Sequence, residues 1–135
     1  MFSGKTVMSG KRILIVDDDF LLAKTLDVCL SRRGYQVRVF HSGANAVKYM
    51  FEERPDLMLV DIRLPDCDGW FLADMMKELE PAHKVPMIVM SVLDPDRSKA
   101  AEAHLYAYIQ KPFDMGQLIQ TVERGLDTEE FLTGS

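Results

Sequence analysis

The sequence has little of the material from which disulfide-bonded or zinc-binding proteins are built. Its 135 residues include two cysteines, Cys29 and Cys67, and three histidines that are separated from one another. The cysteines form no CxxC motif and make a poor disulfide framework, and the isolated histidines form no metal cluster. Proteins without a disulfide framework are typical of reducing compartments, and the sequence therefore predicts a cytoplasmic location.

Long apolar runs are also missing. No stretch approaches the roughly 20 residues of a membrane span, and residues 1–10 lack the hydrophobic segment of a secretory signal. The net charge of −5 disfavours nucleic acid as a direct partner. With 47% hydrophobic and 27% charged residues, the chain has the composition of one ordinary globular domain.

What the sequence does contain is a regular alternation of two hydrophobic patterns. Short apolar runs rich in β-branched residues predict strands, and apolar residues at helical spacing between them predict helices. The predicted strands span 12–16, 35–40, 57–60, 87–90 and 107–110. The predicted helices span 20–33, 42 to just before Pro55, 68–80, 98–103 and 114–126. The remaining ends are interpreted as a flexible leader, 1–10, and an acidic tail or linker, 127–135.

Five repeated strand–helix units predict a fold of the α/β class. Parallel strands need helical crossovers, which place helices on both faces of the sheet. Five strands are too few for a closed eight-stranded barrel. We therefore expect a flavodoxin-like, doubly wound five-stranded parallel sheet of order 2-1-3-4-5, with a crevice between the carboxyl ends of strands 1 and 3.

Polar side chains gather where the predicted strands end. Strand 1 runs into three aspartates, and strands 3, 4 and 5 each end in one polar residue. These residues are Asp17, Asp18 and Asp19, then Asp61, Ser91 and Lys111. Because the carboxyl ends of parallel strands meet at one edge of a sheet, carboxylates, a hydroxyl and an ammonium group should converge there.

Several carboxylates within a few ångströms repel one another unless a cation joins them. Mg²⁺ fits such a cluster, because it takes a few carboxylate oxygens and keeps some of its waters. Calcium would need more oxygen ligands, and transition metals would favour His or Cys. A carboxylate can also act as a nucleophile towards phosphorus, with metal and lysine neutralising the phosphoryl oxygens.

Four segments of the sequence resemble a known family. They are "ILIVDDD", "PDLMLVDIRLPDCDGW", "PMIVMS" and "YIQKPF", in this order and with family-like spacing. Together they resemble the receiver domain of response regulators from two-component signalling, over residues 11–126. The resemblance implies a switch that accepts a phosphoryl group from a histidine kinase or histidine phosphotransfer protein. The resemblance thus implies a phosphoacceptor that assists its own phosphoryl transfer and autodephosphorylation, and not a classical enzyme.

The resemblance also assigns roles to individual residues. It implies that Asp61 is the phosphoacceptor and that Asp17 and Asp18 hold Mg²⁺, Asp18 directly and Asp17 through water. It also implies that the backbone carbonyl of Arg63 is a metal ligand and that Lys111 pairs first with Asp61 and then with the phosphoryl group. Ser91 would donate its hydroxyl hydrogen bond to a phosphoryl oxygen, and Tyr108 would be the aromatic switch. Asp19 carries no family role and is expected to face solvent.

The resemblance further implies a cis Lys111–Pro112 peptide bond and an output face formed by the fourth helix, the fifth strand and the fifth helix. A downstream protein or effector domain would bind this output face, and a phosphorylation-dependent dimer is compatible with the resemblance. The sequence departs from the family in two places. Val92 follows Ser91, where a small residue is usual, and His104-Leu105 stands where Gly-Ala is common.

Two other functions use the same residues. A haloacid-dehalogenase-like phosphatase also has an Asp nucleophile and Mg²⁺, but it needs a second aspartate two residues later. The segment starting at Asp61 has Arg63 in that place, and the triplet at 17–19 supplies it only if Asp17 is the nucleophile. A receiver-like interaction domain that is never phosphorylated is the third reading, and the complete set of site residues argues against it.

Overall fold

The computed structural model of the protein describes residues 10–79, 85–103 and 105–134, with the backbone alone from residue 128. Of the predicted leader only Gly10 lies within these ranges, and Glu80 and His104 lie outside them. Strands and helices alternate along the described residues. They are β1 (Arg12–Val16), α2 (Phe20–Ser31), β2 (Gln36–Phe40), α3 (Gly43–Glu53), β3 (Leu57–Asp61), α4 (Gly69–Leu79), β4 (Met87–Ser91), α5 (Arg97–Glu102), β5 (Ala107–Gln110) and α6 (Met115–Gly134).

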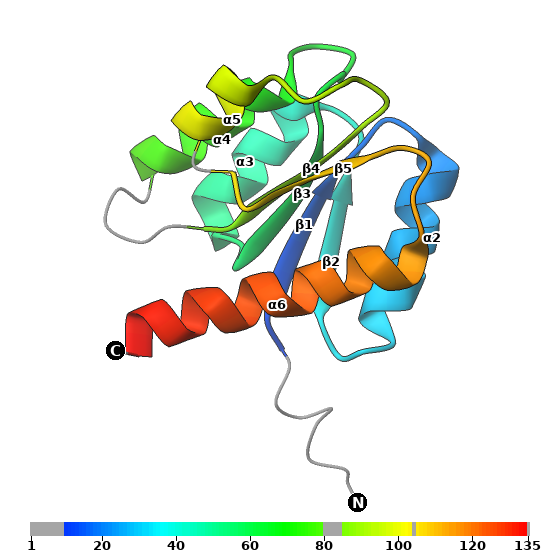
Figure 1. Cartoon of the computed structure of the whole chain (residues 1–135), viewed down its shortest axis with the longest axis vertical. Helices are drawn as coiled ribbons and strands as arrows, with labels where there is room; N and C mark the ends of the chain where they lie inside the picture. Colours follow the sequence, from blue (N-terminus) through cyan, green and yellow to red (C-terminus); the bar gives the residue numbers. More distant parts are fainter. Residues whose placement is uncertain (1–9, 80–84, 104, 135) are drawn as a thin grey trace, which may run out of the picture.

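The strands form one parallel sheet of order β2-β1-β3-β4-β5, which confirms the predicted flavodoxin-like topology. β1 pairs with both β2 and β3, so the chain first builds to one side of β1 and then to the other (Figure 1). This reversal places the carboxyl ends of β1 and β3 side by side without a helix between them. Val16 of β1 pairs with Val60 of β3, so the residues that follow them, Asp17 and Asp61, lie at the same level of the sheet.

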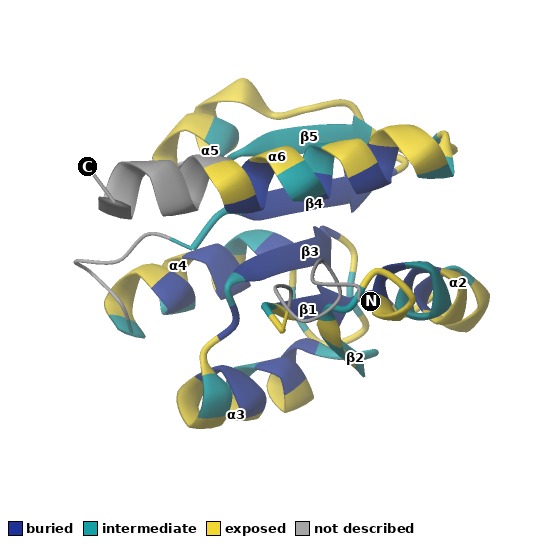
Figure 2. Cartoon of the chain, turned by 90° about the horizontal axis from the view of Figure 1, so that it is seen from below, coloured by how far each residue is buried: buried dark blue, intermediate teal, exposed yellow. Residues whose placement is uncertain are grey.

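Two hydrophobic clusters cover the two faces of the sheet. Alternate strand residues, such as Ile15 and Leu59, pack against α2 and α6, whereas their neighbours, such as Leu14 and Met58, pack against α3 and α4. Figure 1 shows α2 and α6 on one side of the sheet and α3, α4 and α5 on the other. Every residue of β3 and β4 is buried (Figure 2), as the continuous apolar runs predicted for central parallel strands.

Aspartates begin four of the helices, because a carboxylate can accept hydrogen bonds from the free amides of a first helical turn. Asp68 and Asp114 cap α4 and α6 as predicted, accepting from Phe71 N and Gln117 N at 3.0 and 2.9 Å. Asp19, which is exposed as expected, accepts from Leu22 N at the start of α2. The remaining cap lies before α5, where Asp96 accepts from Lys99 N.

The last helix is longer than its periodicity predicted. The apolar spacing predicted an end at about Leu126, but α6 continues to Gly134. The prediction was wrong because residues 127–133 contain neither proline nor glycine, so nothing in them interrupts helical hydrogen bonding. Within the described part of the chain, neither α6 nor any other helix combines the length and apolarity needed to cross a membrane.

Candidate functional site

Three carboxylates meet at the edge of the sheet where β1 and β3 end. Asp17, Asp18 and Asp61 each contribute an oxygen atom to a group whose members lie within 4.8 Å of one another. Asp17 is completely buried, Asp61 is 7% exposed, and Asp18 is exposed. The sequence therefore predicted correctly that these side chains come together.

Lys111 joins two of these carboxylates. Its Nζ donates hydrogen bonds to Asp17 Oδ2 at 2.8 Å and to Asp61 Oδ2 at 2.9 Å. Its pairing with Asp61 was expected, but its contact with Asp17 was not. The Lys111–Pro112 peptide bond that follows is cis, as the resemblance implied.

Burial and charge act in opposite directions on this cluster. Burial raises the pKa of Asp17, even though Lys111 and the Asp19 amide donate hydrogen bonds to the charged carboxylate. Burial also works to lower the pKa of Lys111, but hydrogen bonds to Asp17 and Asp61 outweigh it, and the pKa of Lys111 is raised. The two shifts favour opposite charge states of one ion pair. Two carboxylates hold the ammonium form of Lys111, and further positive charge beside Asp17 would favour the carboxylate form that burial disfavours.

The chemistry of this donor set fits Mg²⁺. Magnesium binds oxygen at about 2.0–2.1 Å, so oxygens on opposite sides of its shell lie about 4 Å apart. The three carboxylate oxygens all lie within 4.8 Å of one another, which is compatible with that separation. Asp61 Oδ1 also accepts a hydrogen bond from Arg63 N at 3.0 Å, which brings the backbone of Arg63 next to the cluster. Asp17, Asp18, Asp61 and the Arg63 carbonyl are therefore the groups that could hold the ion.

Ser91 ends β4 and is completely buried. Its hydroxyl oxygen accepts a hydrogen bond from Leu93 N at 3.1 Å, and its carbonyl accepts one from Lys111 N at 2.8 Å. The residues that follow it are open to solvent, since Val92 is 57% and Leu93 41% exposed. The departure from the family at Val92 thus adds apolar surface beside Ser91, outside the core.

Two side chains of β5 hold the loop that follows β4. The Tyr108 hydroxyl donates to Leu93 O at 2.7 Å, with Asp94 O at 3.4 Å. The Gln110 amide donates to Asp94 Oδ1 at 3.1 Å. Tyr108 was expected here as an aromatic switch, whereas Gln110 was missed, because its neighbours in sequence give no sign of a partner 16 residues away.

His41 is a second residue that the sequence did not indicate. Its Nδ1 lies 2.8 Å from the carbonyl oxygen of Asp17, and its ring stacks on Phe20 with centroids 3.7 Å apart. The sequence pattern around His41 indicates neither of these contacts, because Asp17 and Phe20 lie on a different segment of the chain. Its contact fixes the backbone of Asp17 from the side of β2.

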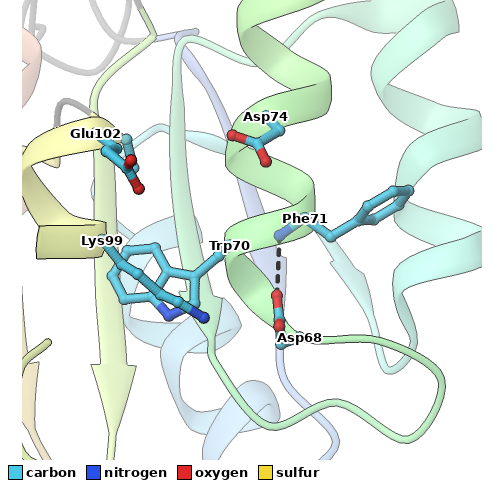
Figure 3. A pocket seen from close by; sticks show the side chains of 7 residues that line it. Asp68, Trp70, Phe71, Asp74, Lys99 and Glu102 are labelled. Carbon is cyan, nitrogen blue, oxygen red and sulfur yellow. Dashed lines mark hydrogen bonds between the residues drawn. The ribbon is translucent and has the colours of Figure 1, made fainter.

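A separate pocket of about 290 Å³ lies between α4 and α5. Trp70 and Asp74 of α4 lie on one side of it and Lys99 and Glu102 of α5 on the other (Figure 3). None of the carboxylates of the cluster lines it. This pocket is therefore distinct from the polar edge of the sheet, and it separates α4 from α5.

Comparison with known proteins agrees with this geometry. Residues 13–123 match the family model described as the response regulator receiver domain. A CheY-like receiver domain protein from Methanospirillum hungatei is 30% identical in sequence, with a TM-score of 0.83 over 90% of this chain and 98% of that one.

Two further solved structures are of the same kind. The receiver domain of a sensor histidine kinase from Pseudomonas aeruginosa, which has a magnesium ion coordinated in its active-site cleft, is 29% identical, with a TM-score of 0.76 over 88% of this chain and 99% of that one. The BeF3-activated DrrB receiver domain is 31% identical, with a TM-score of 0.77 over 87% and 97%. Because the family model covers most of the sequence, the chain belongs to the response regulator receiver domain family.

Proposed function

We propose that this chain is a phosphorylation-dependent signalling switch whose phosphoacceptor is Asp61. The observation that carries the proposal is the convergence of Asp17, Asp18 and Asp61 on Lys111 at the edge of the sheet. Membership of the receiver family supports it. The comparisons give no support to the alternative of a haloacid-dehalogenase-like phosphatase.

The phosphoryl donor is a phosphohistidine on a histidine kinase or phosphotransfer protein. An oxygen of Asp61 attacks phosphorus and forms an O–P bond, while the P–N bond to the donor imidazole breaks and its electron pair stays on nitrogen, which takes up a proton from water. Mg²⁺, held by Asp17, Asp18, Asp61 and the Arg63 carbonyl, would neutralise charge on the phosphoryl oxygens.

The other side chains of the site stabilise the phosphoryl group. Lys111 is an ammonium group already shared between Asp17 and Asp61, so it can move one hydrogen bond to a phosphoryl oxygen with little reorganisation. Ser91 accepts its hydrogen bond from Leu93 N through oxygen, which leaves the hydroxyl proton free to donate. The product is an acyl phosphate, which water then hydrolyses at the same site.

The signal leaves through α5, β5 and α6. Ser91 and Tyr108 both bond to the backbone of Leu93, so a movement of the Ser91 hydroxyl towards phosphate reaches Tyr108 through one residue. This is the kind of bistable contact that a phosphoryl group can bias. A downstream protein or effector domain, or a second phosphorylated copy, would bind this face in the cytoplasm.

The test is intact-mass spectrometry after incubation with phosphoramidate and Mg²⁺. Wild type and Asp19→Ala should each gain one phosphoryl group, and Asp61→Ala should gain none. After removal of the donor, loss of the added mass with Mg²⁺ present measures hydrolysis. Full phosphorylation of Asp61→Ala would refute the assignment, and an unmodified wild type, also with phosphorylated donor proteins, would favour an interaction domain that is never phosphorylated.

A further inference from the structure

The first turn of α3 is capped from outside its own sequence. Ser42 occupies the N-cap position, as predicted, but its side chain makes no capping hydrogen bond within the described residues. The carboxylate of Asp66, from the loop between β3 and α4, takes this place. Its Oδ1 accepts from Gly43 N at 2.8 Å and its Oδ2 from Ala44 N at 2.9 Å. Both hydrogen bonds lower the pKa of Asp66.

The loop that carries Asp66 is closed on itself. Arg63 and Asp68 form an antiparallel bridge across its base. Leu64 N donates to Cys67 O at 3.2 Å, and Gly69 N donates to Ile62 O at 2.8 Å. Because these hydrogen bonds join the two arms of the loop, we expect a displacement of Asp66 to reach Arg63 at the base of the same loop.

The loop also lies close against the start of α3. A Cβ atom added at Gly43 would clash with Cys67 Sγ, so any larger residue at this position would force the thiol to shift. Asp66 and Cys67 therefore contact the same turn of α3, one by hydrogen bonds and the other by packing. A serine at position 42 is able to cap this turn by itself. Because the carboxylate of Asp66 accepts the hydrogen bonds instead, the start of α3 anchors the loop.

We propose that Asp66 is a positioning residue for the metal and phosphoryl site. By anchoring the loop to α3 it holds the backbone of Arg63, whose amide bonds to Asp61 Oδ1 and whose carbonyl is a candidate Mg²⁺ ligand. This inference rests on the function proposed above. Residues that orient metal ligands commonly change metal affinity by about 10- to 100-fold when they are replaced, so Asp66→Ala should weaken Mg²⁺ binding by about tenfold or more.

The experiment separates capping of α3 from positioning of the loop. Four full-length variants are compared with wild type: Asp66→Ala, Asp66→Asn, Asp66→Ala combined with Ser42→Asp, and Glu52→Ala. The Ser42→Asp change returns a carboxylate to the N-cap of α3 without a link to the loop. Glu52, exposed on α3, controls for the loss of one negative charge. Each variant is studied by thermal melting, by Mg²⁺ titration with calorimetry, and by amide hydrogen exchange without metal.

Asp66→Ala should lower the melting temperature, weaken Mg²⁺ binding and speed exchange at Arg63 and Leu64. The added Ser42→Asp should restore the melting temperature but neither Mg²⁺ affinity nor slow exchange. Asp66→Asn, which keeps one carboxamide oxygen, should lie between wild type and Asp66→Ala. Glu52→Ala should leave all three readouts unchanged.

Two results would overturn the inference. One is recovery of Mg²⁺ affinity together with the melting temperature in the Ser42→Asp combination, since Asp66 would then be only a helix cap. The other is unchanged exchange at Arg63 in Asp66→Ala. A wild-type protein that binds no Mg²⁺ would instead count against the proposed function. The hydrogen-exchange data need no metal, so they would still test whether Asp66 anchors the loop.

Discussion

At the scale of single residues, charge in the cluster is only partly compensated. Asp17, Asp18 and Asp61 contribute three carboxylates, and Lys111 is the ammonium group that contacts two of them. Because Asp17 is completely buried, water cannot screen it as it would an exposed carboxylate. The excess of negative charge makes the fold less stable than it would be with a cation in place.

Mg²⁺ should therefore stabilise the unphosphorylated protein. At a free concentration of 100 times its dissociation constant, a ligand bound only by the folded state adds about 2.7 kcal/mol to the free energy of unfolding. Thermal melts with and without Mg²⁺ measure this gain. Asp18→Ala removes an exposed carboxylate of the cluster and should reduce the shift. An identical melting temperature at saturating Mg²⁺ in wild type would contradict a magnesium site.

The hydrogen bonds of Asp66 predict a dependence of stability on pH. The folded pKa of Asp66 lies below its ordinary value of 3.8, so its charged form stabilises the fold above that value. The contribution is lost as the pH falls through the lower folded pKa. The difference in urea midpoint between wild type and Asp66→Asn should thus be largest near neutral pH and shrink below pH 3.8. A constant difference across this range would show that the charge of Asp66 is irrelevant.

At the scale of elements, the junction between β3 and α4 fits closely around Gly69. A Cβ atom added at Gly69 would lie 2.7 Å from the carbonyl oxygen of Asp61, 2.9 Å from Val60 Cγ1 and 3.2 Å from Ile62 Cα. Two of these contacts are with backbone, which cannot move aside as the end of a long side chain can. α4 can therefore approach β3 this closely only with a glycine at its first position.

Gly69→Ala should lower the free energy of unfolding by about 1–3 kcal/mol, the usual range for forcing extra atoms into a packed site. It should also slow phosphorylation, because the displaced backbone belongs to Asp61. Urea unfolding and the phosphoramidate reaction measure the two effects. Gly116→Ala is the matched control, since its new methyl group would meet only the Asp114 carboxylate. Equal stability of the two variants would contradict the predicted strain.

The fluorescence of Trp70, the one tryptophan of the sequence, should report movement of α5. Trp70 lines the pocket between α4 and α5 together with Lys99 and Glu102 (Figure 3). If α5 belongs to the output face, activation with beryllofluoride and Mg²⁺ should change Trp70 emission in a saturable way. Asp61→Ala should show no change. An unchanged spectrum in beryllofluoride-bound wild type would place the response elsewhere.

At the scale of the whole molecule, the two hydrophobic clusters cannot unfold separately. They lie on opposite faces of the same strands, since neighbouring residues such as Leu14 and Ile15 belong to different clusters. Separation of α2 and α6 from the sheet would expose one face of every central strand. The protein should therefore unfold in a single cooperative transition.

Leu30→Ala tests this coupling. Leu30 is completely buried in the cluster beneath α2, and its truncation should lower the free energy of unfolding by about 2–5 kcal/mol. Trp70 packs against the other cluster. Urea curves followed by Trp70 fluorescence and by far-UV circular dichroism should shift together. A shift seen by circular dichroism alone would mean that the two faces unfold independently.

The sequence by itself determined the fold and the edge of the sheet at which the carboxylates meet. Continuous apolar runs are required of strands buried on both faces, and short connections between alternating strands and helices leave few topologies. Once the strands are parallel, their carboxyl ends share one edge. The positions of Asp17, Asp18, Asp61 and Lys111 along the chain were therefore enough to predict their meeting.

Only the tertiary structure decided how these groups are bonded. Lys111 contacts Asp17 as well as Asp61 because Asp17 lies fully beneath the edge of the sheet, and no local pattern encodes that depth. The cap of α3 shows the same limit. Ser42 has the right sequence position, but the carboxylate of Asp66 reaches the helix amides instead. Local sequence sets which groups are available, whereas the packing of distant segments selects among them.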